Sequence, residues 1–229
     1  RGQPMKSILR FCTLLFCSLL VAMISAPAAL LAGVVSHFSQ QRITLADADG
    51  FWWRGSAWVS VSQPGQSALT MPGRLQWEFE PEGPGFRISG SPWLSTPFSA
   101  QWRGKLQLSP GQAQLPASAL QHLGPPFTLV RPGGLLNLSW QNAEQMVIEW
   151  RAARSSLSPL PQLGDYRISV QPGRLQLSTL RGPLQLSGEV VSGHPFSGTA
   201  RSDPEAAEKL AGLLNILGPT SNGITTLRF

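Results

Sequence analysis

The chain has 229 residues, and its 18 Lys and Arg against 12 Asp and Glu give a formal net charge of +6. This positive charge is too small and too scattered for a nucleic-acid-binding face, which needs clustered cations. Only 13% of the residues are charged, while 23 glycines and 20 prolines interrupt the apolar segments. Such a composition is typical of many short strands separated by turns, and it argues against a mainly helical enzyme.

Residues 11–35 form an uncharged, apolar segment that is long enough to cross a membrane as a helix. Cations but no acids precede it, so the positive-inside rule predicts a cytoplasmic tail over residues 1–10 and an exported body over residues 36–229. Residues 26–28, Ala-Pro-Ala, also fit a signal-peptide cleavage site, so removal of the segment is the alternative. We expect the segment to be kept as a transmembrane anchor, because the apolar run continues past these residues. Both cysteines lie within it, so the exported body has no disulfide.

The exported body alternates between apolar and polar residues, which predicts antiparallel strands that are buried on one side. In residues 73–81, Leu75, Trp77 and Phe79 share one face, and polar side chains occupy the other. The predicted strands are residues 42–45, 51–62, 73–81, 86–89, 98–108, 135–140, 146–153, 166–170, 173–179, 184–191, 196–200 and 224–229. We therefore expect a mainly β fold built on a strongly curved antiparallel sheet.

Two short helices are predicted to cover the ends of this sheet. Residues 115–123 form the first, with Pro116 near its start. The second begins after Asp203, where a capping residue, a proline and an acid follow one another. Its apolar stripe consists of Leu210, Leu213, Leu214 and Leu217.

The pentapeptide Pro-Gly-Arg-Leu-Gln occurs at residues 72–76 and again at residues 172–176. Each copy is followed by strands, an Arg-Gly pair and a leucine-rich helix. One interpretation is two pseudo-repeats, over about residues 42–124 and 125–229, within one exported domain. A chance match of five residues is the alternative.

The sequence offers no combination of residues that would carry out catalysis. The three histidines have no acid or cysteine at metal-ligand spacing, and motifs for a nucleophilic serine, zinc or phosphate are missing from the sequence. We therefore predict no enzyme activity, no catalytic or metal site and no cofactor.

Tryptophan is unusually frequent, with eight residues spread over the predicted strands. Our first interpretation is that the rings fill the core on the concave face of the sheet. The second is a surface or groove for a partner or lipid, because aromatic residues are enriched at such interfaces. The candidate interaction or packing residues are Trp52, Trp53, Trp58, Trp77 and Trp102.

Several motifs distinguish the chain further. Residues 45–57 read Leu-x-x-Ala-x-Gly-Phe-Trp-Trp-x-Gly-Ser-Ala, residues 75–77 read Leu-x-Trp, and residues 116–120 read Pro-x-x-Ala-Leu. With the basic-then-apolar N-terminus and the late acidic leucine helix, they make the whole chain resemble the type II secretion system protein N family. The resemblance implies an accessory component, held in the inner membrane and facing the periplasm, of a machine that exports folded proteins through an outer-membrane secretin. It brings no catalytic residues with it.

Two functional hypotheses follow. The first is a structural subunit that contacts the secretin and the inner-membrane platform proteins through strand edges or apolar patches. The second is a periplasmic lipid-binding groove, similar to that of bacterial lipid-bridge proteins. We expect a single-pass inner-membrane protein with most of its chain in the periplasm and no nucleic-acid partner.

Overall fold

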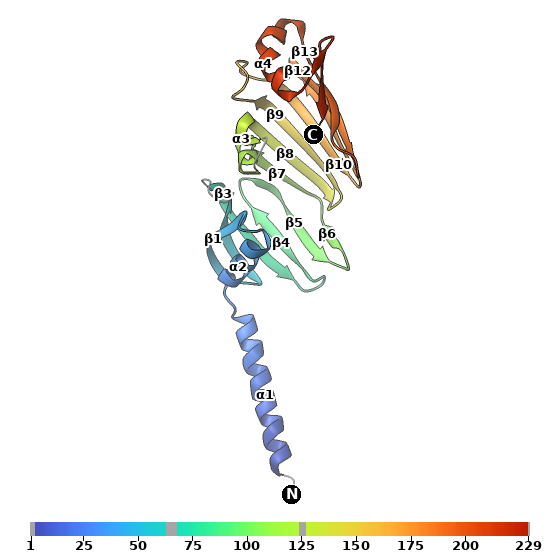
Figure 1. The fold of residues 1–229 in the computed structure, drawn as a ribbon. Helices are drawn as coiled ribbons and strands as arrows, with labels where there is room; N and C mark the ends of the chain where they lie inside the picture. Colours follow the sequence, from blue (N-terminus) through green and yellow to red (C-terminus); the bar gives the residue numbers. More distant parts are fainter. Residues whose placement is uncertain (1–2, 63–67, 124–126, 229) are drawn as a thin grey trace.

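The computed structural model describes residues 3–62, 68–123 and 127–228, apart from the side chains of residues 3–12, 123 and 228. Within these residues, 15 strands form one antiparallel sheet that is not closed (Figure 1). This confirms the mainly β fold. The strands are β1 (Ile43–Phe51), β2 (Arg54–Val61), β3 (Leu69–Glu80), β4 (Gly85–Gly90), β5 (Leu94–Trp102), β6 (Leu106–Leu108), β7 (Gly111–Pro116), β8 (Gly133–Asn142), β9 (Gln145–Arg154), β10 (Gly164–Gln171), β11 (Arg174–Arg181), β12 (Leu184–Val191), β13 (Ser197–Ser202), β14 (Thr220–Ser221) and β15 (Ile224–Arg228).

Strands that follow one another along the chain are neighbours from β1 to β5 and again from β7 to β13. Two strands depart from this order: β6 lies off the main path and pairs with β5, and β15 pairs with β13, so that β14 is the last strand. The helices are α1 (Gln3–Ile24), α2 (Ala28–Phe38), η1 (Ala117–Leu123), α3 (Phe127–Val130), η2 (Pro204–Ala206) and α4 (Ala207–Leu217). Short turns join most of these consecutive antiparallel strands, whereas β7 and β8 are joined through η1 and α3.

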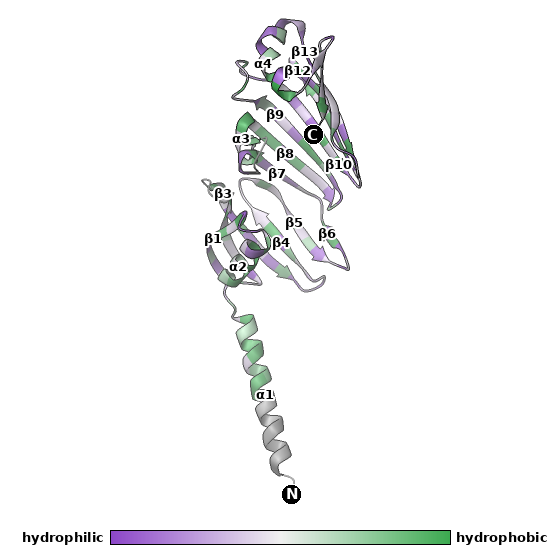
Figure 2. Ribbon diagram, viewed as in Figure 1, coloured by the Kyte–Doolittle hydropathy of each residue, from purple (hydrophilic) through white to green (hydrophobic). Residues whose placement is uncertain are grey.

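The strand register separates the sheet into two chemically different faces. Trp140 lies opposite Met146 on what we call the apolar face, whereas Asn137 lies opposite Glu149 on the polar face. Because successive side chains of a strand point to opposite sides, the alternation in the sequence sets this division. Figure 2 shows the resulting mixture of hydrophilic and hydrophobic residues along the strands.

The predicted membrane span over residues 11–35 is wrong as one continuous helix. Helix α1 ends at Ile24, and Pro27 forms an isolated bridge with Phe51 before α2 begins. Proline disfavours a helical conformation in the residue before it, which explains the break. Helix α2 packs on β1 and β2, where Ala28 joins a small core. Among the described residues we find no helix that is both long and apolar enough to cross a membrane. Of the predicted cytoplasmic tail over residues 1–10, residues 3–10 belong to α1, while residues 1–2 and the side chains of residues 3–10 lie outside this description.

Two further sequence predictions need correction. The predicted strand over residues 98–108 is a hairpin of β5 and β6, which turns at Gly104, where φ is +75°. The predicted helix over residues 115–123 begins only after β7 ends at Pro116, and its residues form η1 beside β8 rather than at an end of the sheet. The helices that cover the ends are therefore α2 and α4.

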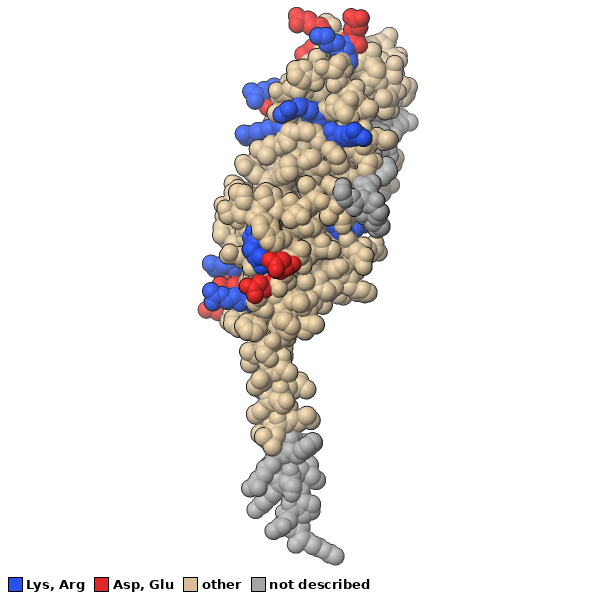
Figure 3. All heavy atoms as spheres, turned by 90° about the vertical axis from the view of Figure 1, so that its left-hand side faces the viewer, with Lys and Arg blue, Asp and Glu red and all other residues tan. Residues whose placement is uncertain are grey.

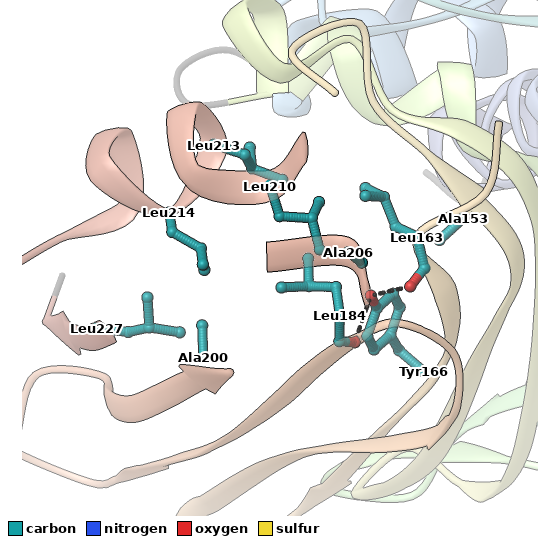
Figure 4. Close-up of a cluster of buried hydrophobic side chains, with 10 residues drawn as sticks. All are labelled: Ala153, Leu163, Tyr166, Leu184, Ala200, Ala206, Leu210, Leu213, Leu214 and Leu227. Carbon is teal, nitrogen blue, oxygen red and sulfur yellow. Dashed lines mark hydrogen bonds between the residues drawn. The ribbon is translucent and has the colours of Figure 1, made fainter. Parts of the chain in front are cut away.

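The predicted C-terminal helix is confirmed, and it closes the largest core. A short turn, η2, precedes α4, whose buried leucines Leu210, Leu213 and Leu214 pack over the apolar face (Figure 4). Tyr166 is 1% exposed in the same core. Its hydroxyl lies 2.9 Å from the Leu184 carbonyl oxygen and 3.1 Å from that of Leu163. Burial raises the pKa of Tyr166 well above its usual value, so the phenol is neutral at physiological pH.

Candidate interaction surfaces

Two of the five candidate tryptophans join the sheet to α1. The indole N–H of Trp52 donates a hydrogen bond to the Met23 carbonyl oxygen at 2.7 Å, and that of Trp53 donates to Ile24 at 3.0 Å. The last carbonyl groups of a helix have no partners within the helix. The turn between β1 and β2 therefore satisfies the end of α1 and ties that helix to the sheet.

Trp77 lies in the core directly beneath this turn. Trp77 is only 4% exposed, and its indole N–H donates a hydrogen bond to the Trp52 carbonyl oxygen at 3.0 Å. A Cβ atom at Gly55 would lie 2.6 Å from the Trp77 ring, so the Trp-x-Gly spacing in the sequence makes room for this ring. Trp77 thus supports the turn that holds α1.

The remaining two candidates lie elsewhere. Trp58 is half-buried and lies opposite Arg74 in the register, on the polar face. Trp102 is 64% exposed at the end of β5. The five tryptophans therefore do not gather in one groove: three form the junction with α1, one lies on the polar face and one lies at a hairpin tip.

The charged side chains of the polar face mostly neutralise one another. Glu149 accepts hydrogen bonds from Arg167 at 2.7 Å and Arg151 at 2.9 Å, and these bonds lower the pKa of Glu149. Arg174 pairs with Glu189 at 2.7 Å. Such exposed ion pairs contribute little to stability. Figure 3 shows how sparse the charges are on the face it presents, where Lys and Arg form a row in the upper half.

One hollow of the polar face is lined by two arginines, Arg181 and Arg201, and has a volume of about 530 Å³. Arg181 is held there because its Nε donates to Asp165 at 2.5 Å. Burial of Asp165 works to raise its pKa, but hydrogen bonds from the Ala152 backbone N–H and from Arg181 outweigh burial, so the pKa of Asp165 is lowered. Sequence reasoning noticed the Arg181-Gly182 pair but missed Asp165, because the two lie 16 residues apart and meet only through the β10–β11 register.

The described residues contain no group of three or more His, Cys, Asp or Glu side chains that could hold a metal ion. Buried side-chain atoms without a hydrogen-bond partner in this part of the chain are Trp93 Nε1, His122 Nδ1 and Asn137 Oδ1. They belong to three different elements, the β4–β5 turn, η1 and β8.

The chain was compared with known families and proteins. The family model described as type II secretion system (T2SS), protein N matches residues 41–228, which is well over half of the chain and takes in β1 to β15. Comparison with curated proteins and with solved structures gave no match. The extent of the family match shows that this chain belongs to the type II secretion system protein N family.

Proposed function

We propose that this protein is a non-enzymatic accessory subunit of the type II secretion machinery that contacts other secretion components in the periplasm. Family membership supports an envelope location and a role in secretion. The observation that carries the proposal is the polar face, which runs the length of an open sheet while α2 and α4 pack over the apolar face. Its hollow between Arg181 and Arg201 offers a site for an acidic side chain of a partner protein.

Attachment to the inner membrane is part of the proposal. Between residues 13 and 24, α1 exposes large apolar side chains around the helix, which water does not favour. The most exposed of them are Leu14, Phe16, Leu19 and Val21, each at least 63% exposed. Of the two N-terminal helices, we assign the membrane contact to α1, because Ala28 and Leu31 of α2 pack against the sheet.

The polar face is tested by site-specific photo-crosslinking in intact cells. A benzophenone amino acid replaces Ser187 or Thr199, which line the polar face, and a matched control carries it at Leu177 on the apolar face. We expect the secretin or the inner-membrane platform proteins to crosslink to the polar-face positions and not to Leu177. Absence of any secretion component from all three samples would overturn the subunit proposal.

A lipid-binding groove is the competing function, because α2 contacts mainly β1 and α4 contacts mainly β15, so neither helix covers the central strands of the apolar face. The middle of the apolar face is filled by its own side chains. Leu94 and Trp140 are buried there, and the ring centroids of Phe98 and Trp140 lie 5.1 Å apart in an edge-to-face arrangement. A filled centre favours the subunit. Phospholipid that copurifies with the protein, together with crosslinks from Leu177 to lipid only, would reverse the choice.

A further inference from the structure

We propose that the tip of the β5–β6 hairpin, residues 102–106, inserts into the headgroup layer of the membrane to which α1 is attached. This second membrane contact rests on the proposed attachment of α1. It would fix the tilt of the whole sheet relative to the membrane, because a single helix allows the helix and the attached sheet to tilt together.

The tip exposes apolar side chains on one side. Trp102 is 64% exposed and Leu106 is 48% exposed, and they lie directly opposite each other in the β5–β6 register. Both therefore point to the same side as the Ala100–Leu108 pair, which belongs to the apolar face. Among the tryptophans of the described residues, only Trp102 is exposed, and the others are buried or half-buried. A large ring left in water at a hairpin tip indicates a contact outside the chain.

The hairpin is accessible because β6 pairs with β5 alone, off the main path of the sheet, whereas β7 pairs with both β5 and β8. β5 pairs with β7 at Leu94 and Thr96 only, so its second half pairs with β6 instead. At the turn, a Cβ atom on Gly104 would meet nothing within 4 Å. The tip is thus open to solvent and small enough to enter a headgroup layer.

The tip lies at the end of the sheet where α1 is attached. In an antiparallel run, the β1–β2, β3–β4 and β5–β6 turns all fall at the same end. Trp52 and Trp53 bind α1 to the first of these turns, and the Trp102 backbone N–H donates to Pro84 in the second at 3.0 Å. Strand spacing places β5 about 19 Å from β1 along the sheet. Figure 1 shows the β5–β6 hairpin in the part of the sheet nearest α1.

The chemistry of the tip fits a headgroup layer. Tryptophan prefers the boundary between headgroups and acyl chains, and the flanking cations Arg103 and Lys105 suit lipid phosphates. Acids offset these cations: Lys105 lies 3.5 Å from Glu144, and Arg103 reaches over the turn that contains Glu82. The tip is therefore close to neutral. We assign its membrane contact to Trp102 and Leu106, and we expect little dependence on salt.

The test places an environment-sensitive NBD label on the full chain in vesicles of phosphatidylethanolamine and phosphatidylglycerol that contain a spin-labelled lipid quencher. Cys12 and Cys17 are first replaced by serine, and single cysteines are then introduced by Leu106→Cys at the tip, Ser192→Cys in the β12–β13 turn, or Leu19→Cys in α1. We expect the lipid to quench the labels at residues 106 and 19 and not the label at residue 192.

The α1 label separates the two ways in which the test can fail. Quenching at residue 19 without quenching at residue 106 overturns the hairpin contact and leaves the attachment of α1 in place. No quenching at either position overturns both. A further variant adds Trp102→Ser to the Leu106→Cys chain: we expect loss of quenching at residue 106 with an unchanged melting temperature, because Trp102 is exposed in the folded chain. Undiminished quenching in that variant would contradict the role of Trp102.

Discussion

The two ends of the sheet are covered by helices that contribute to different kinds of core. At the C-terminal end, α4 contributes three leucines to a core of ten buried residues. At the N-terminal end, α2 contributes Ala28 and the half-buried Leu31 to a core with three buried residues, among them Trp77. The C-terminal end is thus stabilised mainly by burial of aliphatic side chains, whereas the N-terminal end uses aromatic rings and their hydrogen bonds.

The aromatic residues of the N-terminal end converge on the junction with α1. Phe51 stacks on Trp53 with an interplanar angle of 3°, and the rings of Trp52 and Phe79 lie 5.8 Å apart. Aromatic side chains can pack and donate a hydrogen bond at once, so they suit a junction between a sheet and a helix end. The C-terminal end therefore contributes most of the buried core, and the N-terminal end sets the direction of α1.

The largest expected effect is at the C-terminal end. Leu210 is 0% exposed, so Leu210→Ala removes buried methyl groups and leaves a cavity. We expect the free energy of unfolding to fall by about 2–5 kcal/mol, measured by urea unfolding of the full chain. Ile216→Ala on the same helix is the control, since Ile216 is 66% exposed and its loss should change stability by less than about 0.5 kcal/mol. Equal effects of the two variants would contradict the burial of α4.

A smaller loss is expected from Tyr166→Phe. The ring stays in place, but the carbonyl oxygen of Leu184 loses its hydroxyl donor, while that of Leu163 still accepts from the Leu184 backbone N–H at 3.1 Å. Leaving such a group without a partner costs about 1–3 kcal/mol. The same unfolding measurement checks this value, and a variant as stable as the wild type would show that the hydroxyl is dispensable.

The pH dependence of stability tests Asp165. Its pKa is lower in the folded chain than in the unfolded chain, so its contribution is present above the unfolded-state value of about 3.9 and is lost as the pH falls through the folded-state value. We expect the free energy of unfolding to fall on acidification below about pH 4. Asp165→Asn should be less stable than the wild type at neutral pH and should show a shallower fall. Some fall should persist, because the pKa values of Glu80 and Glu149 are also lowered.

The control for the pH measurement is Asp49→Asn at an exposed position of β1. This variant should keep the pH dependence of the wild type. If Asp165→Asn shows the same pH dependence as the wild type, the Arg181–Asp165 contact does not stabilise the folded chain.

The smallest effect is expected at the N-terminal end. Trp53→Phe keeps a ring against Phe51 but removes the hydrogen bond to the Ile24 carbonyl oxygen. A net loss of about 0.5–1.5 kcal/mol corresponds to local opening that is up to about tenfold more frequent. Amide hydrogen exchange over residues 25–30 should therefore speed up while the global unfolding free energy changes little. Trp58→Phe, on the polar face, should leave that exchange unchanged.

The repeated pentapeptide does not adopt the same position in its two copies. In the first copy, Gly73 lies inside β3 with φ +91° and Arg74 pairs with Asp47 at 2.6 Å. In the second copy, Gly173 lies in the β10–β11 turn and Arg174 pairs with Glu189. The same five residues thus occupy different places in the two halves, because their partners are supplied by distant strands.

The sequence by itself determined which side chains share a face of each strand, because the two-residue period is a property of the strand backbone. It also determined α4, through the proline after Asp203 and leucines at helical spacing. Tertiary structure alone decided that residues 28–35 pack on the sheet and that Trp102 is exposed. An apolar helix suits lipid and a sheet face equally well, so only the presence of Ala57 and Trp77 beneath it placed α2 on the sheet. Likewise, the exposure of Trp102 depends on β6 pairing with β5 alone, off the main path of the sheet, which no local pattern in residues 98–108 specifies.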